Sequence, residues 1–243
     1  FGHDCWREGL AARADLGFLV TADALYSDMS GLSQLDYAAK LSKREPVLRD
    51  QLLDALELSH DALKRKLGSY SKGMRQKLAL IVAMQHDPAL LILDEPTDGL
   101  DPLIQRNFED FLISLRDQGR TIFMSSHDLA EVERVCEIVA VIRGGKIVAE
   151  ESIAELLRRH SRRVSVLFSA PIPNGLEHVR GITVTEVNDQ RVELSLAGSP
   201  NELLHFLSLH DVEEMAITPP TLEDIFMSYY GAAPSGQNKP VTA

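Results

Sequence analysis

The sequence predicts an α/β fold, in which helices cover a parallel sheet, with a pair of helices inserted in it and a smaller α+β appendage at the carboxyl end. Three observations support this fold class. Residues 89–93 form an apolar run too short for a helix, which is typical of a strand buried on both faces. Apolar residues recur at helical spacing within residues 30–66. After residue 160 the pattern changes to short alternating strands.

Length and composition narrow the class of protein. The chain has 243 residues, 44% of them hydrophobic, which suits one large domain with an appendage. Its net charge of −11 argues against a nucleic-acid partner, which would need a basic surface. The two cysteines, Cys5 and Cys136, are expected to be free thiols in a reducing compartment. No apolar run approaches the roughly 20 residues of a membrane span. We therefore expect a cytoplasmic protein whose membrane role comes through a partner.

The first half of the chain is expected to alternate strands and helices. Residues 16–20 predict a strand that ends near Thr21. Two helices should follow within residues 30–66, the first capped by Ser33 and the second with Pro46 in its first turn. Ser71 should then open an apolar helix that packs on the sheet, with its first amides available to an anion.

A second helix and a second strand complete this core. Asp101 is a favourable helix cap and Pro102 a favourable first residue, and Gly119 should end that helix. Residues 121–124 predict the next buried strand, which ends at the serines before His127. The carboxyl ends of parallel strands are where ligands of such sheets bind.

Asp94 and Glu95 lie at such a strand end. One carboxylate can hold Mg²⁺ while the other orients or deprotonates an attacking water. The plain alternative is that the pair only ends a strand and caps the segment after it. The neighbouring helix start at Ser71 and the loop before Asp101 favour the functional interpretation, and with it a role for His127 on the adjacent strand.

The second half carries no visible chemistry, which favours a structural or regulatory appendage. A helix is expected over residues 128–136, then two strands around Gly144 and Gly145. Ser152 and Glu155 fit a capping box, and Ser199 with Glu202 fit another helix start. Further strands and a final helix are predicted at residues 164–168, 182–185, 192–196, 212–217 and 221–230. Residues 232–243 are expected to form a flexible tail.

Four motifs in this order resemble the nucleotide-binding subunit of an ABC transporter. They are Y-S-K-G-M at 70–74, L-L-I-L-D-E-P-T at 90–97, D-G-L-D at 98–101 and S-S-H at 125–127. The ending P-T-L-E-D-I-F at 220–226 is similar to that of ABC-2 type exporter ATPases. The resemblance implies an ABC-type P-loop NTPase core over residues 1–160, with a helical subdomain at about 28–75 that docks on the permease. It also implies an accessory α+β domain over 161–231.

The resemblance further implies a site for ATP and Mg²⁺ that is shared by two ATPase subunits, which form a homodimer or a heterodimer. This dimer would be bound to a transmembrane permease at the inner face of the cell membrane. Asp94 would hold the metal, Glu95 would serve as base or water-orienter, and His127 would contact the γ-phosphate. The other implied nucleotide-site residues are Ser71, Lys72 and Gly73, which serve the opposite subunit, Asp101, which couples the two sites, and Thr21, which replaces the usual Gln or Glu. Lys72 and Met74 depart from the general Leu-Ser-Gly-Gly-Gln pattern.

The phosphate-binding pattern G-x-x-x-x-G-K-[ST] does not occur in these 243 residues, and the first residue is Phe1. We expect from this an incomplete ABC core, truncated at its N-terminus and inactive by itself. A subunit that lacks the loop by nature, and lends its Ser71–Gly73 turn to a complete partner or acts as a regulatory module, is the alternative.

Overall fold

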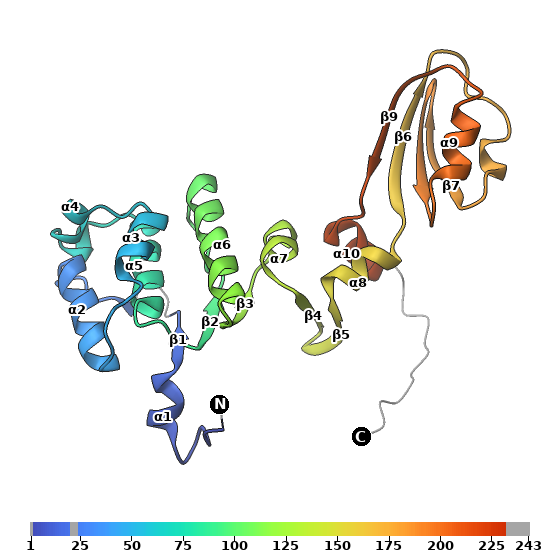
Figure 1. Ribbon diagram of the computed structural model, residues 1–243. Coiled ribbons are helices and arrows are strands. Elements are labelled where there is room, and N and C mark those ends of the chain that lie inside the picture. Colours follow the sequence, from blue (N-terminus) through green and yellow to red (C-terminus); the bar gives the residue numbers. More distant parts are fainter. Residues whose placement is uncertain (1, 20–23, 232–243) are drawn as a thin grey trace. The chain divides into compact units, whose positions relative to one another are not determined.

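The computed structural model describes residues 2–19 and 24–231, with side chains up to residue 226. The chain forms two compact units, Phe1–Val135 and Cys136–Ala243 (Figure 1). Thr21 and the predicted tail at 232–243 lie outside the described residues. The division at residue 160 and the limits of the helical subdomain stay predictions. Within the described ranges, no helix is both long and apolar enough to cross a bilayer.

The first unit combines a small parallel sheet with helices. Its strands are β1 (Leu16–Phe18), β2 (Leu90–Asp94) and β3 (Thr121–Ser125), in the order β1-β2-β3. Its helices are α1 (Gly9–Ala14), α2 (Gly31–Ser42), α3 (Arg49–Ala55), α4 (His60–Leu63), the 3-10 turn η2 (Leu67–Ser69), α5 (Lys72–Met84), α6 (Pro102–Asp117) and α7 (Leu129–Val135). All pairings in this sheet are parallel, and Asp94 lies opposite Ser125. The predicted parallel sheet is confirmed, and the carboxyl ends of β2 and β3 meet at one edge.

The two faces of this sheet differ in burial. Leu91 and Leu93 are buried on one face, whereas Phe18, Ile92 and Phe123 share the other face in register. Phe18 is 53% exposed and Phe123 is 68% exposed. The prediction of a buried strand at residues 121–124 is therefore wrong, because β3 is an edge strand and the described elements leave this face open.

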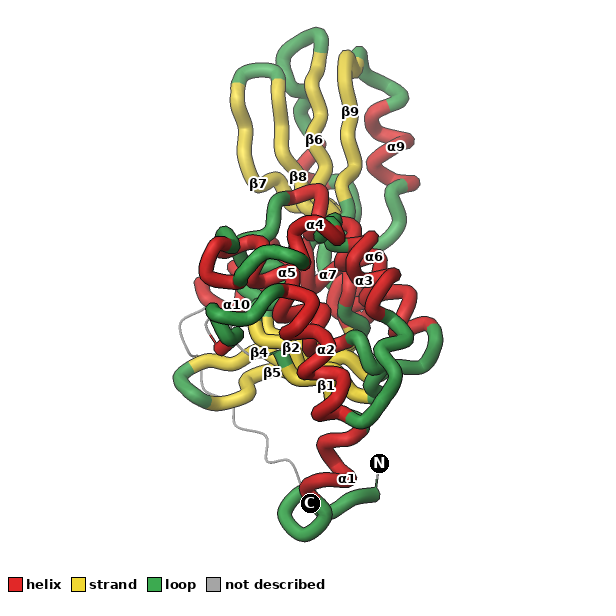
Figure 2. Tube along the Cα trace, turned by 90° about the vertical axis from the view of Figure 1, so that its left-hand side faces the viewer, coloured by secondary structure: helices red, strands yellow, loops and turns green. Residues whose placement is uncertain are grey.

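Helix α5 organises the helical part of the first unit, where it packs against α2, α3 and β1 (Figure 2). Gln85, at its carboxyl end, is buried; its Nε2 donates to the Leu35 carbonyl at 2.9 Å and its Oε1 accepts from Arg49 Nε at 2.8 Å. Gly17 of β1 leaves no room for a side chain, since a Cβ there would lie 2.5 Å from the Ala83 carbonyl oxygen. These contacts fix α5, and with it the turn at its start.

Two predicted helix starts need correction and one is confirmed. The cap of α2 is Ser30, whose side chain accepts from the Ser33 amide, so the chain turns into the helix three residues early. Helix α3 begins at Arg49, which places Pro46 before it. Asp101 caps α6 with Pro102 at its first turn, as predicted.

The second unit contains two antiparallel sheets. The strands are β4 (Ile138–Arg143), β5 (Lys146–Ser152), β6 (Arg162–Phe168), β7 (Ile182–Asn188), β8 (Arg191–Leu196) and β9 (Val212–Thr218). The helices are α8 (Ile153–Arg159), the 3-10 turn η3 (Leu176–His178), α9 (Asn201–Leu207) and α10 (Leu222–Gly231). Strands β4 and β5 form a hairpin, and the larger sheet has the order β7-β8-β6-β9.

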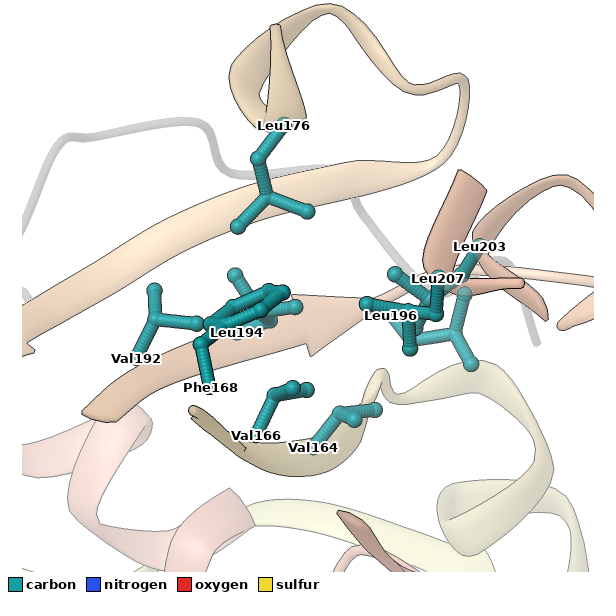
Figure 3. Packing of buried hydrophobic residues seen from close by; sticks show 9 residues of the cluster. All are labelled: Val164, Val166, Phe168, Leu176, Val192, Leu194, Leu196, Leu203 and Leu207. Carbon is teal, nitrogen blue, oxygen red and sulfur yellow. The ribbon is translucent and has the colours of Figure 1, made fainter. Parts of the chain in front are cut away.

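One face of the larger sheet forms an apolar core (Figure 3). Val164, Val166 and Phe168 of β6 alternate with less buried residues, as half-buried strands should. Leu203 and Leu207 of α9 close the same cluster. The strands predicted here are confirmed.

The helix caps of the second unit differ from expectation. Ser152, the last residue of β5, precedes α8 without a side-chain cap bond. The residue at the cap of α9 is Pro200, and Ser199 Oγ accepts from the Asn201 amide at 3.3 Å instead. Both helices occur where predicted, but neither has the predicted capping bond.

Candidate functional site

Asp94, Glu95 and Ser125 meet where β2 and β3 end. The parallel register puts Asp94 opposite Ser125. The Ser125 hydroxyl donates to Asp94 Oδ1 at 2.5 Å and accepts from the Glu95 amide at 3.0 Å. One serine on β3 therefore holds both acidic residues at the end of β2.

The backbone at Glu95 is left-handed, with φ 46°. Such a conformation costs a non-glycine residue about 1–3 kcal/mol and is found at functional sites when its surroundings hold it in place. Here the Asp98 amide donates to the Glu95 carbonyl at 3.2 Å, and Gln76 Nε2 donates to the Pro96 carbonyl at 2.9 Å. Helix α5 thus supports the turn that presents the Glu95 side chain.

His127 contacts that side chain. Its Nδ1 lies 2.7 Å from Glu95 Oε2, and this hydrogen bond, with the charge of Glu95, raises the pKa of His127. The His127 side chain is 81% exposed and that of Glu95 is 38% exposed. A ligand can therefore reach both side chains from solvent while the hydrogen bond between His127 Nδ1 and Glu95 Oε2 stays in place.

The turn before α5 is anchored by Tyr70. This side chain is buried, and its hydroxyl donates to the Ala62 carbonyl at 2.7 Å. Ser71 then caps α5, since its Oγ accepts from the Met74 amide at 3.2 Å. Ser71 therefore acts as a helix cap, and its hydroxyl hydrogen can still be donated to another group.

The same turn lies against the loop of Asp98 and Gly99. A Cβ on Gly73 would lie 2.8 Å from the Gly99 carbonyl oxygen, so only glycine allows this approach. Lys72 Nζ lies 2.8 Å from Asp98 Oδ2, with exposures of 73% and 53%. The Lys72 hydrogen bond lowers the pKa of Asp98.

The structure brings the predicted residues into two groups: Asp94, Glu95 and His127 at the strand ends, and Ser71, Lys72 and Gly73 at the start of α5. Asp101 caps α6, where its Oδ1 accepts from the Ile104 amide at 3.1 Å. Four supporting residues were not singled out from the sequence: Gln76, Thr97, Ser125 and Glu131. The first three lie inside or beside the motifs, whereas the burial of Glu131 had no sequence signal.

Asp94 is the residue here that could hold a metal. Among residues 2–19 and 24–231, no three His, Cys, Asp or Glu side chains gather into a metal-binding group. Mg²⁺ needs no such group, because it binds one or two carboxylates together with phosphate oxygens and waters. The exposed Asp94 carboxylate, with one oxygen bonded to Ser125, fits that limited role beside a bound nucleotide.

Comparison with known proteins identifies the family. Residues 15–133 match a family model described as "AAA domain, putative AbiEii toxin, Type IV TA system". Residues 152–230 match the model of the C-terminal domain of DrrA1-3-like ATP-binding proteins. The uncharacterized ABC transporter ATP-binding protein YhaQ of Bacillus subtilis is 31% identical over 224 residues, which are 89% of this chain and 75% of YhaQ. The chain belongs to the ABC transporter ATP-binding proteins. The match to the DrrA1-3-like domain covers residues 220–226, the ending that resembled ABC-2 type exporter ATPases in the sequence.

Further members of the family extend the comparison. A fluoroquinolones export ATP-binding protein of Mycobacterium tuberculosis is 34% identical over 85% of this chain, and the bacitracin transport ATP-binding protein BcrA of Enterococcus faecalis is 37% identical over 60%. The chain spans 64% and 48% of their lengths.

A solved ATP-binding subunit of an ABC transporter superposes with a TM-score of 0.59 and 25% identity, over 65% of this chain and 67% of that one. A dimeric bacterial ABC cassette shares the fold, with a TM-score of 0.55 and 19% identity over 62% and 68% of the two chains. The predicted P-loop NTPase fold of ABC type is confirmed by these likenesses.

Proposed function

We propose that this chain belongs to the ATP-binding and ATP-hydrolysing subunit of an ABC exporter. The observation that carries the proposal is the 2.7 Å contact between Glu95 and His127, formed at the ends of two adjacent parallel strands beside Asp94. Ligands of parallel sheets bind at these ends. The relatives whose names refer to fluoroquinolone export and bacitracin transport support the exporter part of the proposal.

Glu95 orients or deprotonates the water that attacks the γ-phosphate. A carboxylate oxygen accepts the proton, and the left-handed turn presents it to solvent. His127 keeps one nitrogen on Glu95 and offers the other to the γ-phosphate, so it links the base to the group being transferred. Mg²⁺, when bound, would neutralise charge on the phosphates, and Asp94 would hold it directly or through water.

The turn at Ser71, Lys72 and Gly73 serves the nucleotide of a second ATPase subunit. Helix α5 is long enough to present free amides at its start, where anions bind. Lys72 adds positive charge beside that start. Asp101, at the cap of α6, couples the two sites, and Thr21 is the residue that the resemblance assigns to the metal and nucleotide. The dimeric cassette of the same fold supports this arrangement.

The assembled protein acts at the inner face of the membrane through a permease subunit. This chain by itself does not hydrolyse ATP, because the phosphate-binding pattern G-x-x-x-x-G-K-[ST] does not occur in its sequence. The same observation favours a second candidate, in which the chain lends its Ser71–Gly73 turn to a partner that carries the missing loop.

ATP hydrolysis by the whole ATPase subunit to which this chain belongs, purified with its membrane partners, tests the proposal. Glu95→Gln should lower the rate by a factor of about 10²–10⁴, the usual contribution of a general base. The exposed Glu213 on β9 provides the matched control, and Glu213→Gln should leave the rate unchanged. Equal rates in wild type and Glu95→Gln would contradict the proposal. If an added complete ATPase subunit supplies all the turnover and Glu95→Gln has no effect, the second candidate is correct.

The isolated 243-residue chain should show no turnover under the same conditions. Turnover from the chain alone that disappears in Glu95→Gln would overturn this part of the proposal.

A further inference from the structure

Glu131 of α7 is a buried carboxyl group that the proposed chemistry does not use. It is 4% exposed, and its Oε1 atom is buried with no hydrogen-bond partner among the described residues. Its Oε2 lies 2.5 Å from Ser126 Oγ. Thr97, itself buried, lies near enough for its side chain to lower the pKa of this carboxyl group. Burying a carboxyl group costs free energy unless hydrogen bonds or a charged partner compensate for the lost water.

The two partners of Glu131 belong to different loops. Ser126 is the residue before His127, in the loop that leaves β3. Thr97 is two residues after Glu95, in the loop that leaves β2. The carboxyl group of Glu131 therefore joins the loop that carries the histidine to the loop that carries the base.

The loop of His127 is fixed on both sides by side chains. Ser126 Oγ accepts from the Asp128 amide at 3.0 Å, and Asp128 Oδ1 accepts from the Ala130 amide at 2.9 Å. The His127 side chain itself is little constrained by packing, since it is 81% exposed and its contact is with Glu95. Its orientation depends on where the backbone between Ser126 and Asp128 is held.

The charges around Glu131 favour its neutral form. Burial raises the pKa of Glu131, and the carboxylates of Glu109 on α6 and of Asp128 raise it further. Ser126 and Thr97 act in the opposite direction but do not outweigh burial. Arg134, on the same helix, forms ion pairs with Glu109 and Asp110. A neutral carboxyl carries a proton of its own, so it can donate a hydrogen bond as well as accept one.

We propose that Glu131 is a positioning residue, which holds the His127 loop against the Glu95 loop through Ser126 and Thr97 and so maintains the contact between His127 and Glu95. The inference rests on the proposed function only for the roles of Glu95 and His127.

A nuclear magnetic resonance titration of the histidines in the 243-residue chain tests this without nucleotide. The Glu95 contact raises the pKa of His127, so that pKa reports whether the contact is present. Glu95→Gln defines the value without the contact. Glu131→Leu keeps the volume but cannot hydrogen-bond, Glu131→Gln keeps a neutral group that can donate and accept, and Glu133→Gln is the matched control on the same helix. His178, 82% exposed in the second unit, is the internal standard.

Glu131→Leu should remove at least half of the pKa shift that Glu95→Gln removes, while Glu131→Gln and Glu133→Gln should retain most of it. An unchanged His127 pKa in a folded Glu131→Leu chain overturns the proposal, and so does an equal loss in Glu131→Gln.

If Glu131→Leu fails to fold, Ser126→Ala breaks the same link from the other side. It should lower the pKa of His127, and no change in that pKa would also overturn the proposal. Because the readout needs no ATP, a failure of ATP hydrolysis would contradict the proposed function without affecting this result.

Discussion

The two units place their polar groups in opposite ways. In Phe1–Val135, polar side chains gather at the ends of β2 and β3, where each is bonded to a neighbouring segment. In Cys136–Ala243, less buried residues alternate along β6 and β8, opposite an apolar face that contains Phe168. The first unit thus gathers the polar side chains of the candidate site at one edge of its sheet, while the second spreads polar groups over a sheet face.

This difference assigns reactivity to the first unit and stability to the second. The site of the first unit contains a strained residue, Glu95, and exposed side chains, which are features that reduce stability and permit contact with a ligand. The second unit contains a closed apolar cluster and alternating strands, which are features of a stable module. Substitutions should therefore act on different quantities in the two units.

The largest stability effect is expected in the second unit. Phe168→Ala removes a fully buried aromatic ring from the sheet core and should lower the free energy of unfolding of that unit by about 3–5 kcal/mol. Urea unfolding measures the loss. Leu209→Ala, at a position 70% exposed, is the control and should change it by less than about 0.5 kcal/mol.

The same variant sharpens the comparison between the units. All contacts described for the site come from the first unit, so the pKa of His127 should be unchanged in Phe168→Ala. A fall of that pKa toward the Glu95→Gln value would show that the site depends on the second unit.

A smaller effect is expected where the start of α5 meets the loop of Gly99. In Gly73→Ala the new Cβ would lie 2.8 Å from a backbone oxygen, so the two segments must move apart, at a cost of about 1–3 kcal/mol. Gly68→Ala is the matched control, since its Cβ would approach no atom closer than 3.4 Å. Urea unfolding of both variants decides the matter, and equal losses would show that the close approach is not a constraint.

The smallest effect is expected for Lys72→Ala. The ion pair with Asp98 is exposed, so its loss should change the free energy of unfolding at neutral pH by less than Gly73→Ala does. Lys72 lowers the pKa of Asp98 from its ordinary value of 3.8. The pair therefore stabilises the fold fully at pH values above 3.8, and this stabilisation is lost as the pH falls through the lowered pKa. A carboxyl titration should show a higher pKa for Asp98 in the variant. No change in that pKa would mean that the pair does not form in solution.

Much of this organisation could be predicted from the sequence, because strand ends and helix starts have strong local signals. The run at residues 89–93 and the cap at Asp101 located β2 and α6 correctly. The exposure of Phe123 could not be predicted, since burial depends on which elements cover a face rather than on the strand itself. Glu131 was missed for a similar reason: on a helix, a glutamate between apolar residues looks solvent-exposed until its neighbours are known.

The candidate site was predicted residue by residue, but not its connections. Sequence order placed Asp94, Glu95 and His127 near strand ends, and the register of β2 and β3 then brought them together. The bridging roles of Ser125 and Gln76 needed three-dimensional distances, because each joins segments at least 19 residues apart.

A double-mutant cycle in ATP hydrolysis tests the central claim, that Glu95 and His127 act as one unit across two loops. The rates of Glu95→Gln, His127→Ala and the double variant are compared with wild type in the protein assembled with its membrane partners. Residues that act together give non-additive losses. The account predicts that the double variant loses about as much as the more damaging single variant. Losses that multiply, as for two independent sites, would contradict it.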